Sequence, residues 1–425
     1  MGMNPASTPS RIRWLLILWM FLAAAIVYLD RVNMSVMGQA IAKEFHLSHI
    51  QLGWVFSALI AGYALFQAPA GWAADRFGPR LVLAAGVLWW SVFTSMITLL
   101  SASMAGLLVI MIAVRFCLGS GEAVVFPSSN CVVAAWIPSS ERGKANGFIF
   151  AGVGFGAGIT PPLVTYLLIH SGWRASFWAS SVLGLAAGWG WYAIARNKPA
   201  EHPWVNRGEL ELIQDGLPKP PNRQPGAKLS WSAIVCNPEV LKVTLSYFAF
   251  GYSAYIFFSW FFIYVSSARG LDLKQSSYYS MLPFLAMAIA SPLGGWISDR
   301  ITRGAGKWYG RCVFSAGAMC LSAGFMASGT QVASAGWASL VLAGGAGALY
   351  LSQSCFWSTS ADIGKSSAGS VSGFMNMGNQ TAGAITASLT PVIAKHLGWT
   401  ASFLVAAGLS VVGAISWLAL KPEKE

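Results

Sequence analysis

Gly71-Trp-Ala-Ala-Asp75-Arg76 and Gly295-Trp-Ile-Ser-Asp299-Arg300 are two copies of one short pattern, and each copy follows a long apolar run. The two copies lie 224 residues apart in a chain of 425 residues. A repeat separated by about half of the chain indicates duplication. The pattern therefore predicts two similar halves, each with a short charged turn after its second apolar segment.

The composition on either side of this repeat is that of a membrane protein. Hydrophobic residues make up 55% of the chain and charged residues 10%, with a mean hydropathy of +0.57. A membrane-spanning helix needs about 20 mostly apolar residues. Twelve stretches meet this need, at approximately 14–38, 50–73, 80–100, 104–134, 143–169, 174–195, 241–268, 276–299, 309–328, 333–357, 366–393 and 399–420. We expect an all-α membrane protein with twelve transmembrane helices.

The segment 196–240 divides these stretches into two groups of six. It contains seven prolines and many charges, as a linker between domains does. The sequence therefore predicts an N-terminal six-helix half at 1–195, a linker at 196–240 and a C-terminal six-helix half at 241–425.

Lys and Arg are distributed unevenly across the predicted membrane. With the N-terminus inside, 20 of the 27 fall on the cytoplasmic side and five outside. Positive residues favour the cytoplasmic side, so both termini and the linker are predicted to be cytoplasmic. The net charge of +12 reflects this topology and contact with anionic lipid headgroups, and no nucleic-acid partner is expected.

Only four charged residues fall inside the apolar stretches and away from their ends: Asp30, Arg31, Arg115 and Glu122. An ionisable group in hydrocarbon is costly unless it faces a partner or a water-filled path, so such groups mark transport sites. Arg115 and Glu122 are two helical turns apart and share one face, whereas the neighbours Asp30 and Arg31 point in different directions.

The chemistry of these four side chains suggests a division of roles. Arginine keeps its proton at working pH, so Arg31 is expected to bind a carboxylate through paired hydrogen bonds. Asp30 and Glu122 are then the groups that take up and release protons, with Arg115 as a switching partner. The alternative is two structural ion pairs with no part in turnover.

The loop Gly71-x-x-x-Asp75-Arg76-x-Gly78-x-Arg80 resembles the loop signature of major facilitator transporters, and the second copy matches it more loosely. That resemblance implies two six-helix halves that rock about a central site. Asp75, Arg76 and Arg80, with Gly71 and the repeat residues Asp299 and Arg300, are predicted to form a charge lock that breaks when the cytoplasmic gate opens. The alternative is a short turn that needs its charges only for topology.

A closer resemblance rests on three motifs: Tyr28-Leu-Asp30-Arg31-Val-Asn33-Met-Ser35, Arg115-Phe-Cys-Leu-Gly119-Ser-Gly-Glu122 and Phe126-Pro127-Ser-Ser-Asn130. These are similar to the anion:cation symporter family, which includes bacterial hexonate and hexuronate transporters and animal sialin. The resemblance implies a substrate role for Arg31, a coupling role for Glu122 and a fourth-helix partner in Arg115. Asp30 matches the acid of the bacterial sugar-acid members.

Other polar residues are predicted to line the same cavity. Tyr63 and Gln67 share a helix face, and the resemblance makes Tyr63 a substrate contact, as it does Trp357, Ser358 and Asn376. Further candidate contacts are Tyr28, Gln67, Tyr255, Gln353, Ser354 and Asn379. Helix packing is the alternative for Tyr63, Gln67 and Tyr255, and interhelical hydrogen bonding is the alternative for Gln353 and Asn379.

The prediction is thus a monomeric proton-coupled importer of a small organic anion, most consistent with a sugar acid, in the bacterial inner membrane. None of the five His lies in a predicted span, and no metal site, catalytic residue or cofactor is predicted. The remaining alternatives are a proton-coupled exporter of lipophilic or cationic compounds and, less favoured, a membrane enzyme or receptor.

Overall fold

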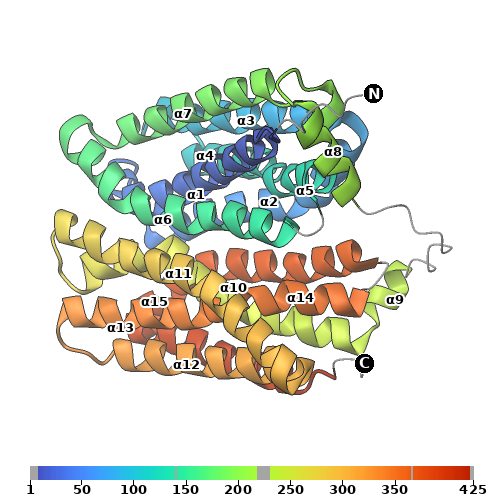
Figure 1. Ribbon diagram of the computed structural model, residues 1–425. Coiled ribbons are helices and arrows are strands. Elements are labelled where there is room, and N and C mark those ends of the chain that lie inside the picture. The colour runs from blue at the N-terminus through green and yellow to red at the C-terminus, as the bar shows by residue number, and fades with distance from the viewer. Residues whose placement is uncertain (1–7, 139–140, 218–229, 365–366, 422–425) are drawn as a thin grey trace, which may run out of the picture.

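The protein was examined as a computed structural model, which describes residues 8–138, 141–217, 230–364 and 367–421. The chain is all-α over these residues, and its helices form two bundles that lie side by side (Figure 1). The first bundle is coloured blue to green and the second yellow to red, so the division follows the order of the chain. This arrangement confirms the predicted all-α fold.

The first half consists of seven helices that run back and forth across the bundle. They are α1 (Ile12–Glu44), α2 (His49–Phe77), α3 (Pro79–Met96), α4 (Leu107–Glu122), α5 (Val125–Trp136), α6 (Arg142–Ser171) and α7 (Trp173–Ile194). A capping box at Ser48 and Gln51 starts α2. Within this half α1 packs on α6, α2 on α4, and α3 on α7.

The second half repeats this plan. Its helices are α10 (Pro238–Ile263), α11 (Leu273–Ala305), α12 (Phe314–Gly329), α13 (Ala335–Leu351), α14 (Gln353–Gly364) and α15 (Ala368–Leu418). The pairing of α11 with α13 corresponds to that of α2 with α4. Gly78 ends α2 and Gly306 ends α11, each with a positive φ of 83° and 89°, so both copies of the repeat turn on a glycine.

Ten helical segments of the described chain are long and apolar enough to cross a membrane. One of them is α15, where Gly398 has a non-helical backbone (φ 83°, ψ 164°) and divides the helix at the boundary between two predicted spans. Another predicted span, 174–195, is α7, a 22-residue helix outside the ten. The exact count of twelve therefore stays a prediction.

Two of the predicted spans are broken inside the bundle. The stretch 104–134 forms α4 and α5, which meet just after Glu122, and the stretch 333–357 forms α13 and the start of α14, which meet at Ser352. Hydropathy does not predict these breaks, because the apolar composition continues across both of them.

The predicted linker begins with structure of its own. Helix α8 (Arg207–Gly216) lies against the first half, and α9 (Trp231–Val235) lies beside the second (Figure 1). We call the end of the molecule that carries α8 and α9 the linker end, and the opposite end the far end. The region 218–229, which contains four of the linker prolines, lies outside the described residues.

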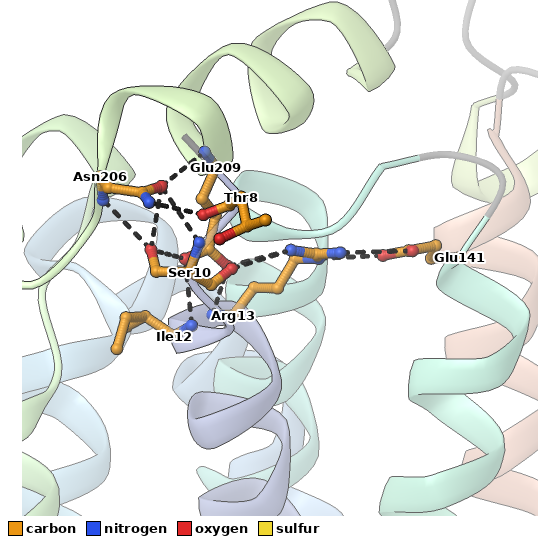
Figure 2. A network of polar contacts seen from close by, with 7 residues as sticks. All are labelled: Thr8, Ser10, Ile12, Arg13, Glu141, Asn206 and Glu209. Carbon is orange, nitrogen blue, oxygen red and sulfur yellow. Dashed lines mark hydrogen bonds and ion pairs between the residues drawn. The ribbon is translucent and has the colours of Figure 1, made fainter. Parts of the chain in front are cut away.

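A buried carboxylate fastens α8 to the start of α1 (Figure 2). Glu209 accepts hydrogen bonds from the Ser10 hydroxyl (2.5 Å), the backbone N–H of Ile12 (3.0 Å) and both the backbone and guanidinium of Arg13 (3.1 and 3.0 Å). The first N–H groups of a helix lack partners within the helix. Glu209 supplies acceptors for two of these N–H groups in α1, and its negative charge lies at the positive end of the helix dipole. Arg13 also pairs with Glu141 at 3.0 Å, just before α6.

The two halves are joined by polar contacts in the far part of the bundle. The Ser35 hydroxyl donates to the Ser259 carbonyl (2.7 Å), and the Ser57 hydroxyl donates to the Ala384 carbonyl (2.6 Å). The Gln39 amide donates to Ser266 at 2.9 Å and also to Ser267. No ion pair between described residues joins the halves, so these polar contacts are hydrogen bonds between neutral groups.

Candidate functional site

The centre of the molecule contains a buried ion pair between α1 and α4. Arg31 Nε lies 3.0 Å from Glu122 Oε2, and the two side chains are 5% and 0% exposed. Glu122 is the last residue of α4, where the helix dipole disfavours a negative charge. The guanidinium of Arg31 offsets this, but a buried pair of this kind contributes little net stability.

The other two charges predicted from the sequence surround this pair and have no hydrogen-bond partners. Both carboxylate oxygens of Asp30 are buried and unbonded, as are Nε and Nη1 of Arg115. Within the ion pair itself, Glu122 Oε1 and Arg31 Nη2 are also unbonded. Most buried polar groups in proteins are satisfied, so this concentration indicates a site that exchanges partners.

Two tyrosine rings flank the arginine. The guanidinium carbon of Arg31 lies 4.4 Å from the ring centre of Tyr63 and 4.9 Å from that of Tyr28. Both distances fit cation–π contacts, which keep the charge in place without using its N–H groups. The fold thus places the predicted substrate contacts Tyr28 and Tyr63 next to Arg31.

A small cavity opens beside Arg31 at the boundary between the halves. Its lining comes from both halves and includes both cavity arginines: Arg31, Ser35, Phe56, Leu59, Ile60, Arg115, Tyr255, Phe258 and Ser259. The free volume is about 20 Å³, which is enough for about one water molecule. A sugar acid needs more space, so this conformation has the halves packed closely around the site.

The second half reaches Arg31 through Tyr255 of α10. Arg31 Nη1 donates to the Tyr255 hydroxyl (3.2 Å), which in turn donates to Gln380 Oε1 on α15 (2.6 Å). All three side chains are buried. Tyr255 was predicted as a cavity residue, whereas Gln380 was not.

A second chain of hydrogen bonds reaches the same place through Tyr63. The Gln67 amide donates to the Tyr63 hydroxyl (3.2 Å), and the Asn376 amide on α15 donates to Gln67 Oε1 (2.8 Å). Tyr63 and Gln67 therefore do share a helix face, and Asn376 joins them from the other half.

The remaining candidates of the second half lie on α14 and α15. Trp357 is half-buried against Phe150 and Tyr247, and its ring N–H has no partner. Gln353 donates to the Tyr247 hydroxyl (3.1 Å), and Ser358 is half-buried. These positions fit a cavity wall.

Two further candidates lie against neighbouring helices of the second half. The Ser354 hydroxyl donates to the Ser291 carbonyl of α11 (3.3 Å). Asn379 packs so closely on Gly251 of α10 that a Cβ there would lie 2.4 Å from the amide oxygen. The alternative for Asn379 was an interhelical hydrogen bond. Its amide oxygen is buried without a partner, so the role of Asn379 in the cavity stays a prediction.

The predicted gating residues lie at the linker end and stay within their own halves in this conformation. Asp75 accepts from the Cys131 thiol (3.3 Å), Arg76 lies over Trp72, and Arg80 donates to the Tyr192 carbonyl (3.0 Å). Gly71 lies next to Pro127 of α5, with enough space for a Cβ. Asp299 is exposed and Arg300 lies over Trp296. A charge lock across the halves is thus a prediction for another conformation.

Two residues of the site were missed by reading the sequence. Gln380 was not singled out, although it lies four residues after Asn376 on the same helix face. Tyr247 was not singled out either. The i, i+4 spacing of Asn376 and Gln380 is the signal in the sequence that could have identified Gln380 as a site residue. Within the described residues, no cluster of His, Cys, Asp and Glu is placed to hold a metal ion.

Comparison with known families gives a match over most of the chain. The model of the Major Facilitator Superfamily matches residues 20–387. A probable sulfoacetate transporter of Cupriavidus necator is 34% identical, with 93% of this chain and 91% of the relative covered. A hexuronate transporter of Bacillus subtilis is 30% identical, with 94% and 92% covered. These findings confirm the resemblance that was read from the motifs.

Plant and structural relatives extend this picture. The ascorbate transporter of Arabidopsis thaliana chloroplasts is 30% identical over 95% of this chain and 74% of its own length. A crystal structure of a bacterial homolog of the human lysosomal transporter Spinster, inward-facing and unoccupied, superposes with a TM-score of 0.76 at 16% identity, covering 98% of this chain and 97% of that one. This likeness concerns the fold alone.

Proposed function

The chain belongs to the Major Facilitator Superfamily, and we propose that it imports a small organic anion together with protons. It is a multi-pass membrane transporter and not an enzyme. The observation that carries the proposal is the buried Arg31–Glu122 pair, which has an unbonded Nη2 on the arginine and an unbonded Oε1 on the acid. We propose a sugar acid or a similar carboxylate as the cargo.

The names of the relatives support a carboxylate cargo. Besides sulfoacetate and hexuronate transporters, they include a probable galactarate/D-glucarate transporter of Bacillus subtilis and a probable L-galactonate transporter of Escherichia coli. All of these compounds are small acids, most of them with several hydroxyls. Arg31 is suited to the acid group, and the amides of Gln67, Gln353 and Asn376 are suited to hydroxyls.

Protons enter the mechanism through the two acids. A cargo carboxylate on Arg31 competes with Glu122 for the guanidinium, and a Glu122 that loses its partner is stabilised by taking up a proton. Arg31 and Arg115 keep their protons throughout, so Asp30 and Glu122 are the sites that can be loaded and unloaded. Cargo and proton then each favour binding of the other, as linkage requires for symport.

Topology completes the proposal. A count of twelve spans is supported by dividing α15 at Gly398 and adding α7 to the ten apolar segments, and a cytoplasmic linker end is supported by the bias of Lys and Arg. The far end then faces outside, so this conformation is closed toward the outside. We propose a monomer in the bacterial inner membrane, with rocking of the two halves about the Arg31 site.

Uptake into proteoliposomes tests the proposal. Labelled glucuronate, galactonate, gluconate, sialate and sulfoacetate would be offered with an inward proton gradient, with an inward sodium gradient, and with neither. We expect one of these acids to accumulate under the proton gradient, and Glu122→Gln to lose accumulation while keeping exchange of internal for external cargo. Glu211→Gln, an exposed acid of α8, is the matched control.

Three results would contradict the proposal in different ways. Accumulation driven only by sodium would replace the proton as the coupling ion. Unchanged accumulation by Glu122→Gln would remove this residue from coupling. No uptake of any anion, together with proton-driven efflux of a lipophilic cation, would favour the exporter.

A further inference from the structure

The Tyr255 hydroxyl is the point where the buried arginine meets the second half directly. It accepts from Arg31 Nη1 at 3.2 Å and donates to Gln380 Oε1 at 2.6 Å. A phenol has one hydrogen, and its oxygen accepts through lone pairs. Because Gln380 takes the hydrogen, the lone pairs of Tyr255 are left for Arg31.

Helix packing places Gln380 where it can accept the hydrogen of the Tyr255 hydroxyl. It is 5% exposed on α15, in the same region as Gly383, which lies so close to the Tyr255 ring that a Cβ would come within 2.5 Å of it. The ring of Tyr255 is therefore fixed by α15, and its hydroxyl hydrogen is fixed by Gln380. Asn376, one turn earlier on the same helix, contacts Gln67 of the first half.

A cargo carboxylate that uses both terminal nitrogens of Arg31 must compete with this hydroxyl. Nη2 is unbonded, but Nη1 already donates to Tyr255. Paired hydrogen bonds from arginine to carboxylate are stronger than one bond to a neutral oxygen, so a carboxylate is able to displace the phenol. Displacement would release the contact between Arg31 and the second half.

We infer that Gln380 is a positioning residue that orients the Tyr255 hydroxyl to hold Arg31 against the second half until a cargo carboxylate displaces it. This inference rests on the proposed function. It makes Tyr255 a competitor of the cargo, so that binding at Arg31 and separation of the halves near the far end become linked.

The inference predicts an unusual direction of change in transport kinetics. Without Gln380 as acceptor, Tyr255 is a weaker competitor, so the KM for the cargo falls or stays constant. The link between binding and movement of the halves is also weaker, so the maximal rate falls, by an expected three- to tenfold. Loss of an ordinary substrate contact raises KM instead.

Four variants separate this role from a structural one. Gln380→Met keeps the length of the side chain and removes the acceptor, whereas Gln380→Glu restores an acceptor and is expected to recover at least half of the maximal rate. Tyr255→Phe removes the hydroxyl itself, which is the donor of the same hydrogen bond. Because Gln380 acts through that hydroxyl, the double variant is expected to match Tyr255→Phe alone. Gln331→Met, at an exposed glutamine in the far-end loop, is the control.

A measurement that needs no cargo keeps failure of the inference apart from failure of the proposed function. Spin labels at Lys43→Cys and Lys274→Cys, both exposed at the far end, report the distance between the halves in the purified protein. Four accessible cysteines would first be replaced by serine: Cys117, Cys131, Cys236 and Cys320. Gln380→Met is expected to broaden the distance distribution toward longer values, and Gln380→Glu to restore it.

The outcomes are decisive in both directions. A raised KM in Gln380→Met, an effect that adds to that of Tyr255→Phe, or an unchanged distance distribution would overturn the inference. A lowered or constant KM with a lower rate, no added effect in the double variant and a broadened distribution would establish it. If the wild type carries no anion but the distance still depends on Gln380, the positioning role stands and the proposed function fails.

Discussion

Two buried arginine–glutamate pairs in this molecule have the same length and different surroundings. Arg13 and Glu209 meet at 3.0 Å at the linker end, and Arg31 and Glu122 meet at 3.0 Å in the centre. Both glutamates are fully buried, and both arginines are less than a tenth exposed. The ion-pair distance alone therefore does not distinguish them.

The difference lies in how completely each carboxylate is satisfied. Glu209 uses both oxygens and accepts from Ser10, Ile12 and Arg13, including two backbone N–H groups that no side-chain motion can remove (Figure 2). Glu122 accepts one hydrogen bond, through one oxygen.

Under the proposed mechanism, this difference separates a structural pair from one that takes part in transport. A fully satisfied polar network fixes one arrangement, whereas a partly satisfied one leaves alternative arrangements within reach. The linker-end pair makes α8 part of the first half, so that half moves as one body. The central pair keeps bonding capacity that a cargo and a proton can use.

The largest expected effect follows from removing the central arginine. Arg31→Ala is expected to lower uptake by roughly a thousandfold, because the cargo loses its paired, charge-assisted contact, and a loss of about 4 kcal/mol in that interaction corresponds to this factor. The fold is expected to survive, since Glu122 can take up a proton. Initial uptake rates in proteoliposomes, with thermal unfolding of the purified variant, measure both.

The substitution at the other pair sharpens this prediction. Arg13→Ala is expected to lower the unfolding temperature and to leave transport per folded molecule within about threefold of wild type. If Arg13→Ala abolishes transport at full stability, or Arg31→Ala unfolds the protein at full activity, the distinction between the pairs is wrong.

A second effect concerns the stability that Glu209 supplies. Glu209→Ala leaves Arg13 with Glu141 alone and leaves the first N–H groups of α1 unpaired. We expect a loss of about 3 kcal/mol in the free energy of unfolding and an unfolding temperature lower by about 5 °C. Thermal unfolding in detergent measures this.

The matched substitution is again at the centre. Glu122→Gln, which keeps the shape of the side chain, is expected to change the unfolding temperature by less than half as much as Glu209→Gln. Equal decreases in unfolding temperature for the two glutamine variants would show that the number of hydrogen bonds to the carboxylate does not determine its contribution to stability.

The sequence predicted the central residues and missed the linker-end network for one physical reason. A charge within an apolar stretch stands out, so Asp30, Arg31, Arg115 and Glu122 were all identified. Arg13, Glu141 and Glu209 lie in polar segments with many other charges, and only the folded chain brings them together from positions up to 196 residues apart. Periodicity cannot predict contacts of that kind.

The pairing within the site was also beyond the sequence. Arg115 shares the face of Glu122 on α4, yet Arg31 of α1 is the one that binds it. That choice depends on how α1 packs against the end of α4, and on the break after Glu122 that hydropathy does not show. The sequence thus pointed to the four buried charges, and the packing decided which of them pair.

A third effect, of pH, is expected at the linker end. His202 Nε2 donates to the Ile194 carbonyl (3.0 Å) and Nδ1 accepts from the Trp204 N–H (3.2 Å), which requires a neutral ring. Burial lowers the pKa of His202 below its ordinary value of 6.5, and Arg196 lowers it further. The unfolded chain therefore binds a proton more readily, and stability is lost as pH falls below 6.5.

Unfolding temperatures at pH 7.5 and 5.0 test this effect. The wild type is expected to lose more stability between these pH values than His202→Gln, which cannot be protonated. The difference between the two proteins isolates His202 from other titrating groups. An equal loss in both would show that the ring does not contribute.

The smallest effect is expected at a third arginine–glutamate pair, on the exposed face of α8. Arg207 and Glu211 meet at 2.9 Å, with side chains 89% and 59% exposed. The pair is spaced i, i+4 with the arginine first, the less favourable order along a helix, and Arg207 lies at the positive end of the helix dipole. Such a pair contributes at most about 0.5 kcal/mol. Glu211→Ala is therefore expected to leave the unfolding temperature within about 1 °C of wild type. A loss as large as that of Glu209→Ala, two residues away on the same helix, would mean that charge in α8, and not the burial and bonding of Glu209, holds the linker end together.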